Sequence, residues 1–265
     1  MTTSSKFRNG LSWVRSILFF DPLIYLYTIV LGILSLLSSF IDRDGRIQHG
    51  FARLWSRLIL HTIFCPVKVE GLDRIDTSRP HVYAVNHISA LDIPIVYEHL
   101  PFQFRIMAKK ELFRYPFMGW HLRRSGQIPV DASSAAASMR SLMKAVKSLQ
   151  SGMPLVVFPE GGRSPNGQIL PFMSGAFYIA IKAGVDVVPM ALIGTYEVLK
   201  MNSYHIRPGP MELIFGEPIS TDGYGLRDMD VLAARVQKAI EDLYYARSQV
   251  ADPRVAVEKG LEASS

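Results

Sequence analysis

The run Asn-His-Ile-Ser-Ala-Leu-Asp at 86–92 holds two residues, His87 and Asp92, whose types and spacing could do acid–base chemistry. It follows a β-like run at 81–85 and precedes a helix-like run at 93–96, so a strand-to-helix turn separates the two side chains. A carboxylate that meets an imidazole across such a turn fixes the tautomer and stabilises the imidazolium that forms. The run therefore predicts a histidine base with an aspartate partner, without naming the group that loses its proton.

Two other interpretations of this run are open at this point. Residues 89–92 match the S-x-x-D form of a capping box, in which Ser89 caps a helix and Asp92 bonds back to the Ser89 amide. A Ser-His-Asp hydrolase is the other interpretation. However, Ser89 lies two residues after His87, and the chain has no G-x-S-x-G elbow. That order and spacing do not suit a serine nucleophile.

A second motif, Phe-Pro-Glu-Gly-Gly-Arg-Ser at 158–164, follows a β-like run. Its glycines, Gly161 and Gly162, let backbone N–H groups approach a ligand closely, and Arg163 can bind a phosphate through two hydrogen bonds. Glu160 is unusual in an anion site and could order Arg163 or the loop instead. The same residues would also make an ordinary turn.

A third motif begins with two adjacent cations, Lys109 and Lys110, followed by apolar residues up to Trp120. Either lysine could supply a point charge for a phosphate. A solvated charge pair is the simpler explanation, because exposed lysines are the norm.

The bulk properties set limits on the class of protein. The 265 residues suffice for one α/β domain with an appendage, and the net charge of +6 with a pI of about 9.4 favours an anionic partner. A single cysteine, Cys65, excludes an internal disulfide and a cysteine cluster for a metal. The histidines are scattered, so the sequence predicts neither a bound metal nor a cofactor.

The N-terminal part differs from the rest. Residues 22–40 form an uncharged apolar run close to the length that crosses a bilayer, and Asp21 makes it a poor signal peptide. The run could span the membrane, enter one leaflet or be buried. Residues 51–62 then show a basic, amphipathic helical pattern with Trp55, which suits a membrane interface but also a helix on the protein's own core. The sequence thus predicts a membrane-anchoring helical hairpin at 1–64.

Residues 65–250 have the pattern of an α/β domain. Strand-like and helix-like runs alternate, which predicts a mainly parallel sheet flanked by helices. The strands are expected at 81–85, 104–108, 127–130, 154–158, 187–193 and 211–215, and the clearest helices at 133–150, 172–183 and 228–248. Residues 251–265 are expected to form a flexible C-terminal tail.

The motifs occur in the order 86–92, 109–120, 158–164 and 188–192, and together they resemble the glycerolipid acyltransferase family, which includes bacterial 1-acyl-glycerol-3-phosphate acyltransferases. The resemblance covers about residues 65–220. It implies transfer of a fatty acyl group from coenzyme A or acyl carrier protein to the free hydroxyl of a lysophospholipid. Lysophosphatidic acid is the expected acceptor and phosphatidic acid the expected product.

The resemblance also implies roles for individual residues. His87 would be the base that deprotonates the acceptor hydroxyl, and Asp92 would orient it. The substrate-binding residues would be Lys109, with Lys110 beside it, and Glu160, Gly161, Gly162 and Arg163. Val188-Pro189 would support the acyl site. No covalent acyl-enzyme is required.

Partners and location follow from the same resemblance. They are a lysophospholipid, an acyl thioester, the bilayer and acyl carrier protein, but no nucleic acid. The protein would be membrane-associated at the cytoplasmic face of the inner (plasma) membrane.

Two positions depart from the family pattern. Gly162 stands where threonine is common, and Ala132 stands where an arginine commonly follows the run Pro-Val-Asp at 129–131. The missing arginine removes a phosphate contact of about 1.5–3 kcal/mol. Another lysolipid acceptor is therefore an alternative. A non-catalytic lipid-binding protein and a thioesterase-like hydrolase are rivals from other classes.

Overall fold

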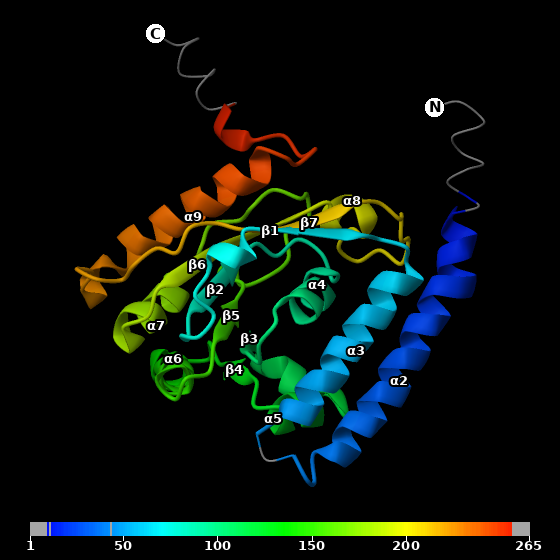
Figure 1. Cartoon of the computed structure of the whole chain (residues 1–265), viewed down its shortest axis with the longest axis horizontal. Coiled ribbons are helices and arrows are strands. Elements are labelled where there is room, and N and C mark those ends of the chain that lie inside the picture. The colour runs from blue at the N-terminus through cyan, green and yellow to red at the C-terminus, as the bar shows by residue number, and fades with distance from the viewer. Residues whose placement is uncertain (1–9, 11, 43, 256–265) are drawn as a thin grey trace.

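The computed structural model describes residues 10, 12–42 and 44–255. Within them a seven-stranded sheet has the order β1-β7-β6-β2-β5-β3-β4, in which every neighbouring pair is parallel except β6 with β7 (Figure 1). The strands are β1 (Val67–Glu70), β2 (Val82–Val85), β3 (Arg105–Lys109), β4 (Ile128–Val130), β5 (Leu155–Val157), β6 (Val187–Ile193) and β7 (Met211–Phe215). The prediction of a mainly parallel sheet flanked by helices is confirmed.

The α-helices are α2 (Asp21–Ser38), α3 (Arg46–Thr62), α4 (Asp92–His99), α5 (Met118–Arg124), α6 (Ala135–Gln150), α7 (Gly175–Ala183), α8 (Thr195–Val198) and α9 (Met229–Tyr245). A π-helical turn, η1 (Ser16–Phe20), leads into α2, and the 3₁₀ turns are η2 (Leu72–Arg74), η3 (Lys110–Arg114) and η4 (Leu226–Asp228).

Local sequence explains where the helices begin and end. Ser134 caps α6, because its hydroxyl accepts a hydrogen bond from the amide of Ala137. Gly184 ends α7 with a φ of 67°, a left-handed conformation that costs glycine little. The predicted helix at 172–183 begins later, at Gly175, because the Phe172 amide donates to the side chain of Gln237 instead.

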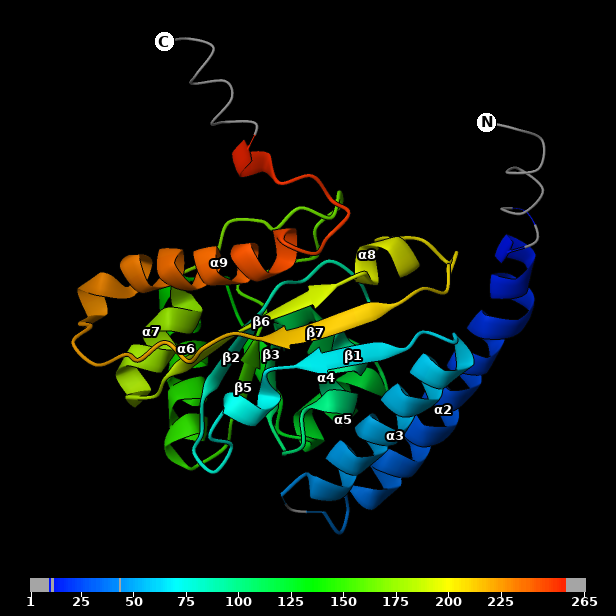
Figure 2. The ribbon, with the colours of Figure 1, turned by 45° about the horizontal axis from the view of Figure 1, so that its top comes forward.

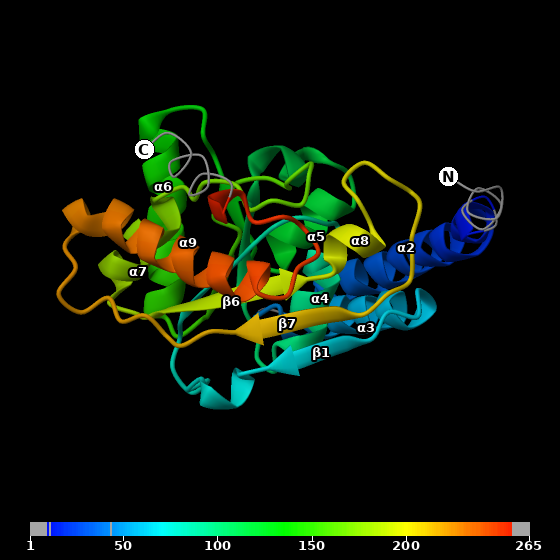
Figure 3. The ribbon, with the colours of Figure 1, turned by 90° about the horizontal axis from the view of Figure 1, so that it is seen from above.

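Helices cover both faces of the sheet, and strand β2 shows how the core is divided. Tyr83 and Val85 pack on the side of α3 and α4, whereas Val82 and Ala84 pack on the side of α6, α7 and α9. Figure 3 shows β1 at one edge of the sheet, with α5 and α6 toward the other edge, where β4 is the last strand. This arrangement leaves the loops at the strand ends free to form a site.

The N-terminal helices differ from the predicted two-helix anchor. Ser12–Ser38 is a single helix long and apolar enough to cross a membrane, and only 11% of its most apolar window is buried. Helix α3 lies beside it (Figure 2), but its inner face packs into the core with α4 through Ile59 and Leu60. One face of α3 thus packs on the protein's own core, while Ile47 and Leu54 stay exposed, so the structure supports one apolar N-terminal helix and the second half of the predicted anchor stays a prediction.

The described part of the expected C-terminal tail carries specific contacts. Arg254 pairs with Asp252 and Asp242, and its guanidinium lies over the ring of Tyr245. Residues 256–265 of that predicted tail lie outside the described residues.

Candidate active site

Three neighbouring parallel strands, β2, β5 and β3, end at the same edge of the sheet. His87 follows β2, Glu160 follows β5, and Lys109 is the last residue of β3. Sites in open parallel sheets form beyond the carboxyl ends of the strands, because the loops there converge. The sheet order thus brings together three motifs that are far apart in the sequence.

His87 and Asp92 are in direct contact. Nδ1 of His87 lies 2.8 Å from Oδ2 of Asp92, and the side chains are 18% and 0% exposed, respectively. Because a carboxylate can only accept, Nδ1 carries the hydrogen and Nε2 keeps its lone pair. Nε2 has no hydrogen-bond partner within the described chain, so it is the atom able to accept a proton.

Asp92 is held by the backbone of the turn that it supports. Its Oδ2 also accepts from the amides of Ile88, at 2.7 Å, and Ser89, at 2.8 Å. Oδ1 is buried without a partner among the described residues. The turn that brings Asp92 to His87 is therefore fixed by the same oxygen that holds the imidazole.

Half of the capping-box interpretation is confirmed, since Asp92 bonds back to the Ser89 amide, but the Ser89 side chain does not cap α4. Leu91 precedes the helix, and its amide lies 3.3 Å from the Ser89 hydroxyl oxygen, whereas that hydroxyl donates to the carbonyl of Leu199 at 2.7 Å. Ser89 is fully buried. These contacts give the hydroxyl a structural use and keep it away from solvent.

Glu160 connects the loop that carries His87 to the 158–164 loop through hydrogen bonds. One carboxylate oxygen accepts from the His87 amide at 2.6 Å and the other from the Leu170 amide at 2.8 Å. The Ser164 amide donates to the His87 carbonyl at 2.9 Å. Both backbone groups of His87 are thus bound to the 158–164 loop, so Glu160 positions the histidine from 73 residues away.

Burial raises the pKa of Glu160 from 4.5 to about 8, although its two amide hydrogen bonds act in the opposite direction. The folded protein therefore holds this proton more tightly than the unfolded chain. Between about pH 4.5 and about pH 8 the unfolded chain has lost the proton while the native state keeps it. Glu160 thus makes the free energy of unfolding fall as the pH rises through this window.

Glu160→Gln is expected to lower kcat about tenfold and to leave the acceptor KM nearly unchanged, because the amide loses one of two backbone hydrogen bonds. Steady-state kinetics separate the two parameters, and urea unfolding at about pH 5 and about pH 9 should show a weaker pH dependence. Glu111→Gln, an exposed carboxylate of η3, is the control. A rise in the acceptor KM alone would instead make Glu160 a ligand contact.

The sequence interpretation did not assign roles to Phe158 and Asn86, although both lie in the motifs. The ring of Phe158 packs on the His87 imidazole with centroids 4.2 Å apart. The Asn86 side-chain amide bonds to both the N–H and the C=O of Leu192 in β6, at 2.7 Å and 3.0 Å. Asn86 directly precedes His87, which was an available signal, whereas the contact of Phe158 with His87 joins two motifs far apart in the sequence.

The two glycines of the 158–164 loop, Gly161 and Gly162, differ in the space around them. Gly161 has a φ of 69°, and a Cβ there would lie 2.7 Å from the sulfur of Met173, so a side chain is strained. A Cβ on Gly162 would meet only Nζ of Lys109, at 3.9 Å. The space at Gly162 therefore admits a side chain, and Lys109 reaches this loop.

Lys110 and Arg163 are placed differently from Lys109. Nζ of Lys110 pairs with Asp131 at 2.6 Å, and this contact holds the pKa of Asp131 well below its usual range. Arg163 is exposed and forms no ion pair within the described chain, so its guanidinium remains available to an anion.

Val188 and Pro189 are buried in β6, the strand beside β2. In the described ranges no group of His, Cys, Asp and Glu is arranged to hold a metal.

The fold and the order of these motifs define an acyltransferase. Residues 66–193 match the family described as Acyltransferase. A 1-acyl-sn-glycerol-3-phosphate acyltransferase from Limnanthes douglasii is 30% identical over 75% of this chain and 69% of its own length. A chloroplastic enzyme of the same name from Arabidopsis thaliana is 32% identical over 66% of this chain and 49% of its own length.

A solved structure agrees with these relatives. The crystal structure of the 1-acyl-sn-glycerophosphate acyltransferase PlsC from Thermotoga maritima superposes with a TM-score of 0.71 and is 28% identical. The match covers 89% of this chain and 94% of that chain. The chain therefore belongs to the 1-acyl-sn-glycerol-3-phosphate acyltransferase family and is an enzyme of that class.

Proposed function

We propose that this enzyme transfers a fatty acyl group from a thioester to the free hydroxyl of 1-acyl-sn-glycerol-3-phosphate, which gives phosphatidic acid. The contact between His87 and Asp92 at 2.8 Å carries the proposal, because it is the arrangement of a general base. Relatives named for this reaction and the family motifs support the choice of acceptor.

In the proposed mechanism, Nε2 of His87 takes the proton of the acceptor hydroxyl as its oxygen attacks the thioester carbonyl. Asp92 stabilises the imidazolium that forms. The tetrahedral intermediate then expels the thiolate, which takes the proton back from Nε2, so the base is regenerated without an acyl-enzyme. The buried hydroxyl of Ser89 takes no part.

Lys109 and Arg163 are proposed to hold the phosphate of the acceptor. Lys109 reaches Gly162, and the exposed Arg163 follows in the same loop. A lysine supplies a compact charge, whereas an arginine binds a phosphate with two parallel hydrogen bonds. Because Ala132 supplies no cation where an arginine is common, these two side chains would carry most of the head-group recognition.

Arg163→Ala is expected to raise the KM for lysophosphatidic acid about tenfold or more, since a charged hydrogen bond to phosphate is lost. The value of kcat should change little, and a phosphate-free acceptor such as monoacylglycerol should be affected less. Arg140→Ala, an exposed arginine of α6, is the control. An equal loss on both acceptors would assign Arg163 a structural role.

We also propose association with the cytoplasmic face of the membrane, where acyl thioesters are made. An apolar groove of about 510 Å³ lies between the end of α2 and α5, and Phe117 and Trp120 in its wall are 61% and 52% exposed. Arg124 lines the same groove and suits the phosphate level of a bilayer. Flotation with phospholipid vesicles tests this, and protein that stays unbound would contradict it.

The decisive experiment supplies purified protein in detergent with a panel of lysolipids and both kinds of thioester, with mass spectrometry of the products. Phosphatidic acid as the main product supports the proposal, and another diacyl lipid would change the acceptor. Free fatty acid alone would indicate a thioesterase. If no acceptor gives a product, the result would indicate a non-catalytic lipid-binding protein.

A further inference from the structure

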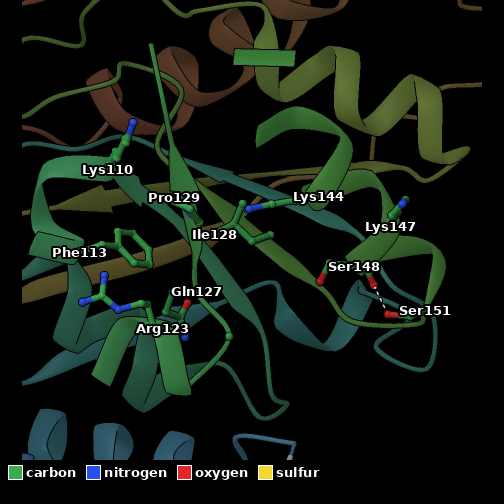
Figure 4. A pocket seen from close by; sticks show the side chains of 11 residues that line it. Lys110, Phe113, Arg123, Gln127, Ile128, Pro129, Lys144, Lys147, Ser148 and Ser151 are labelled. Atoms are coloured by element: carbon green, nitrogen blue, oxygen red, sulfur yellow. Dashed lines mark hydrogen bonds between the residues drawn. The ribbon is translucent and has the colours of Figure 1, made fainter. Parts of the chain in front are cut away.

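A cationic groove of about 650 Å³ lies along β4, the end strand of the sheet. Most of the residues that line it lie outside the four sequence motifs. Figure 4 shows its walls: Lys144, Lys147 and Ser148 come from α6, and Arg123 comes from α5 on the other side of β4.

The charge of the groove is strongly one-sided. Four of its lining residues are cations and none is an acid. Lys110 is partly neutralised by Asp131, but Arg123, Lys144 and Lys147 form no ion pair with any described residue. The Ser148 hydroxyl adds a neutral donor at one end, whereas the Ser151 hydroxyl already donates to the Ser148 carbonyl at 2.7 Å. A ligand with several phosphate groups is the chemical complement of such a wall.

The volume suits a small molecule. It lies in the range of roughly 300–1,000 Å³ that is typical of small-ligand and cofactor sites, although the groove is open along one side. The apolar groups in its wall are mostly buried, since Phe113 and Ile128 are each 5% exposed and Pro129 is half-buried. The phosphates are therefore the part of a nucleotide that this groove is suited to bind.

The groove is connected to the candidate active site through two consecutive lysines. Lys110 lines the groove, while Nζ of its neighbour Lys109 lies beside Gly162 in the loop that clamps His87. Their Cα atoms are about 3.8 Å apart, as in any trans peptide. The end of the groove at Lys110 thus adjoins the residue whose side chain reaches the loop bound to His87.

We infer that this groove binds the 3′-phosphate and diphosphate of coenzyme A, so that the acyl donor is an acyl-coenzyme A. The inference rests on the proposed function, and it adds Arg123, Lys144 and Lys147 as donor-binding residues. The thioester lies at the far end of the pantetheine arm. The reaction is the transfer described above, with the thiolate of coenzyme A as leaving group and His87 returning the proton to it.

The test is the double variant Lys144→Ala/Lys147→Ala. Its KM for palmitoyl-coenzyme A should rise about tenfold at unchanged kcat, because two exposed charge contacts are lost. The Kd of adenosine 3′,5′-bisphosphate, measured by calorimetry, should rise by a similar factor. Arg227→Ala/Arg235→Ala, which removes two exposed charges outside the groove, should change neither value.

Three results would overturn the inference. One is an unchanged KM for palmitoyl-coenzyme A in the Lys144→Ala/Lys147→Ala variant. The second is absence of adenosine 3′,5′-bisphosphate binding to the unaltered protein. The third is a loss confined to transfer from acyl carrier protein, which would make the groove a protein-docking surface. The proposed function fails by a different result, namely that the unaltered protein transfers no acyl group from either donor. In that case the calorimetry still tests whether the groove binds adenosine 3′,5′-bisphosphate.

Discussion

His87→Ala should reduce acyl transfer about a thousandfold, because removal of a general base typically costs two to four orders of magnitude in rate. Nε2 of the ring has no hydrogen-bond partner among the described residues, and alanine leaves no nitrogen there to take the proton. The thioester and lysolipid KM values should change much less than kcat. Single-turnover measurement of diacyl product gives the rate of the chemical step directly.

Loss of the ring also removes packing on Phe158 and leaves Asp92 with its two backbone donors alone. Circular dichroism and thermal unfolding must therefore show that the variant is folded. His87→Gln, which restores much of the volume without a base, should be as inactive. His61→Ala, an exposed histidine of α3, should be fully active. Near-normal transfer by the folded His87→Ala protein would end the assignment of His87 as the base.

Asp92→Asn should lower kcat by a similar factor, about a thousandfold, although the histidine itself is intact. An amide carries no charge to stabilise the imidazolium. In either orientation its NH₂ group is also poorly placed. If the NH₂ group takes the place of Oδ2, it faces the three N–H donors of His87, Ile88 and Ser89. If it takes the place of Oδ1, it is buried without an acceptor among the described residues. The free energy of unfolding should therefore fall by about 1–3 kcal/mol as well.

The control for this second prediction is Asp42→Asn. The Asp42 carboxylate accepts from the amides of Arg46 and Gln48 at the start of α3, so it makes the same kind of backbone contacts without a histidine. It should lose stability and keep kcat. A comparable loss of kcat in both variants would show that Asp92 acts through folding and not through His87.

Much of the sheet could be predicted, and the failures have physical causes. Strand β6 occupies the predicted residues because it is a continuous apolar run, as expected for a strand buried on both faces. Strand β1, which was not predicted, is a short Val-Lys-Val-Glu segment at the edge of the sheet and is only partly buried.

Helix α3 shows why an amphipathic pattern identifies its covered face only in part. Of the apolar positions in the pattern, Ile59 is buried and Trp55 packs on the core, whereas Leu54 is exposed and the polar Gln48 and Ser56 are buried. A hydrophobic stripe indicates which side prefers to avoid water, whereas the actual cover depends on neighbours distant in sequence, here α2 and α4.

The candidate site was predictable as a set of residues but not as an arrangement. Short-range spacing was enough to expect the contact between His87 and Asp92. Nothing in the sequence shows that Glu160 would bind the His87 backbone, since that contact depends on β2 and β5 being neighbours. The different surroundings of Lys109 and Lys110 likewise depend on where the chain leaves β3.

The double attachment of His87 to the 158–164 loop also limits how this enzyme could change its substrate. A mutation that reshapes the backbone at Glu160 or Ser164 would move the base along with the loop that we propose to bind the acceptor, so specificity and rate would change together. Gly162 has room for a side chain and makes no hydrogen bond to the His87 backbone. New head-group preferences can therefore evolve, or be engineered, through this position with the base left in place.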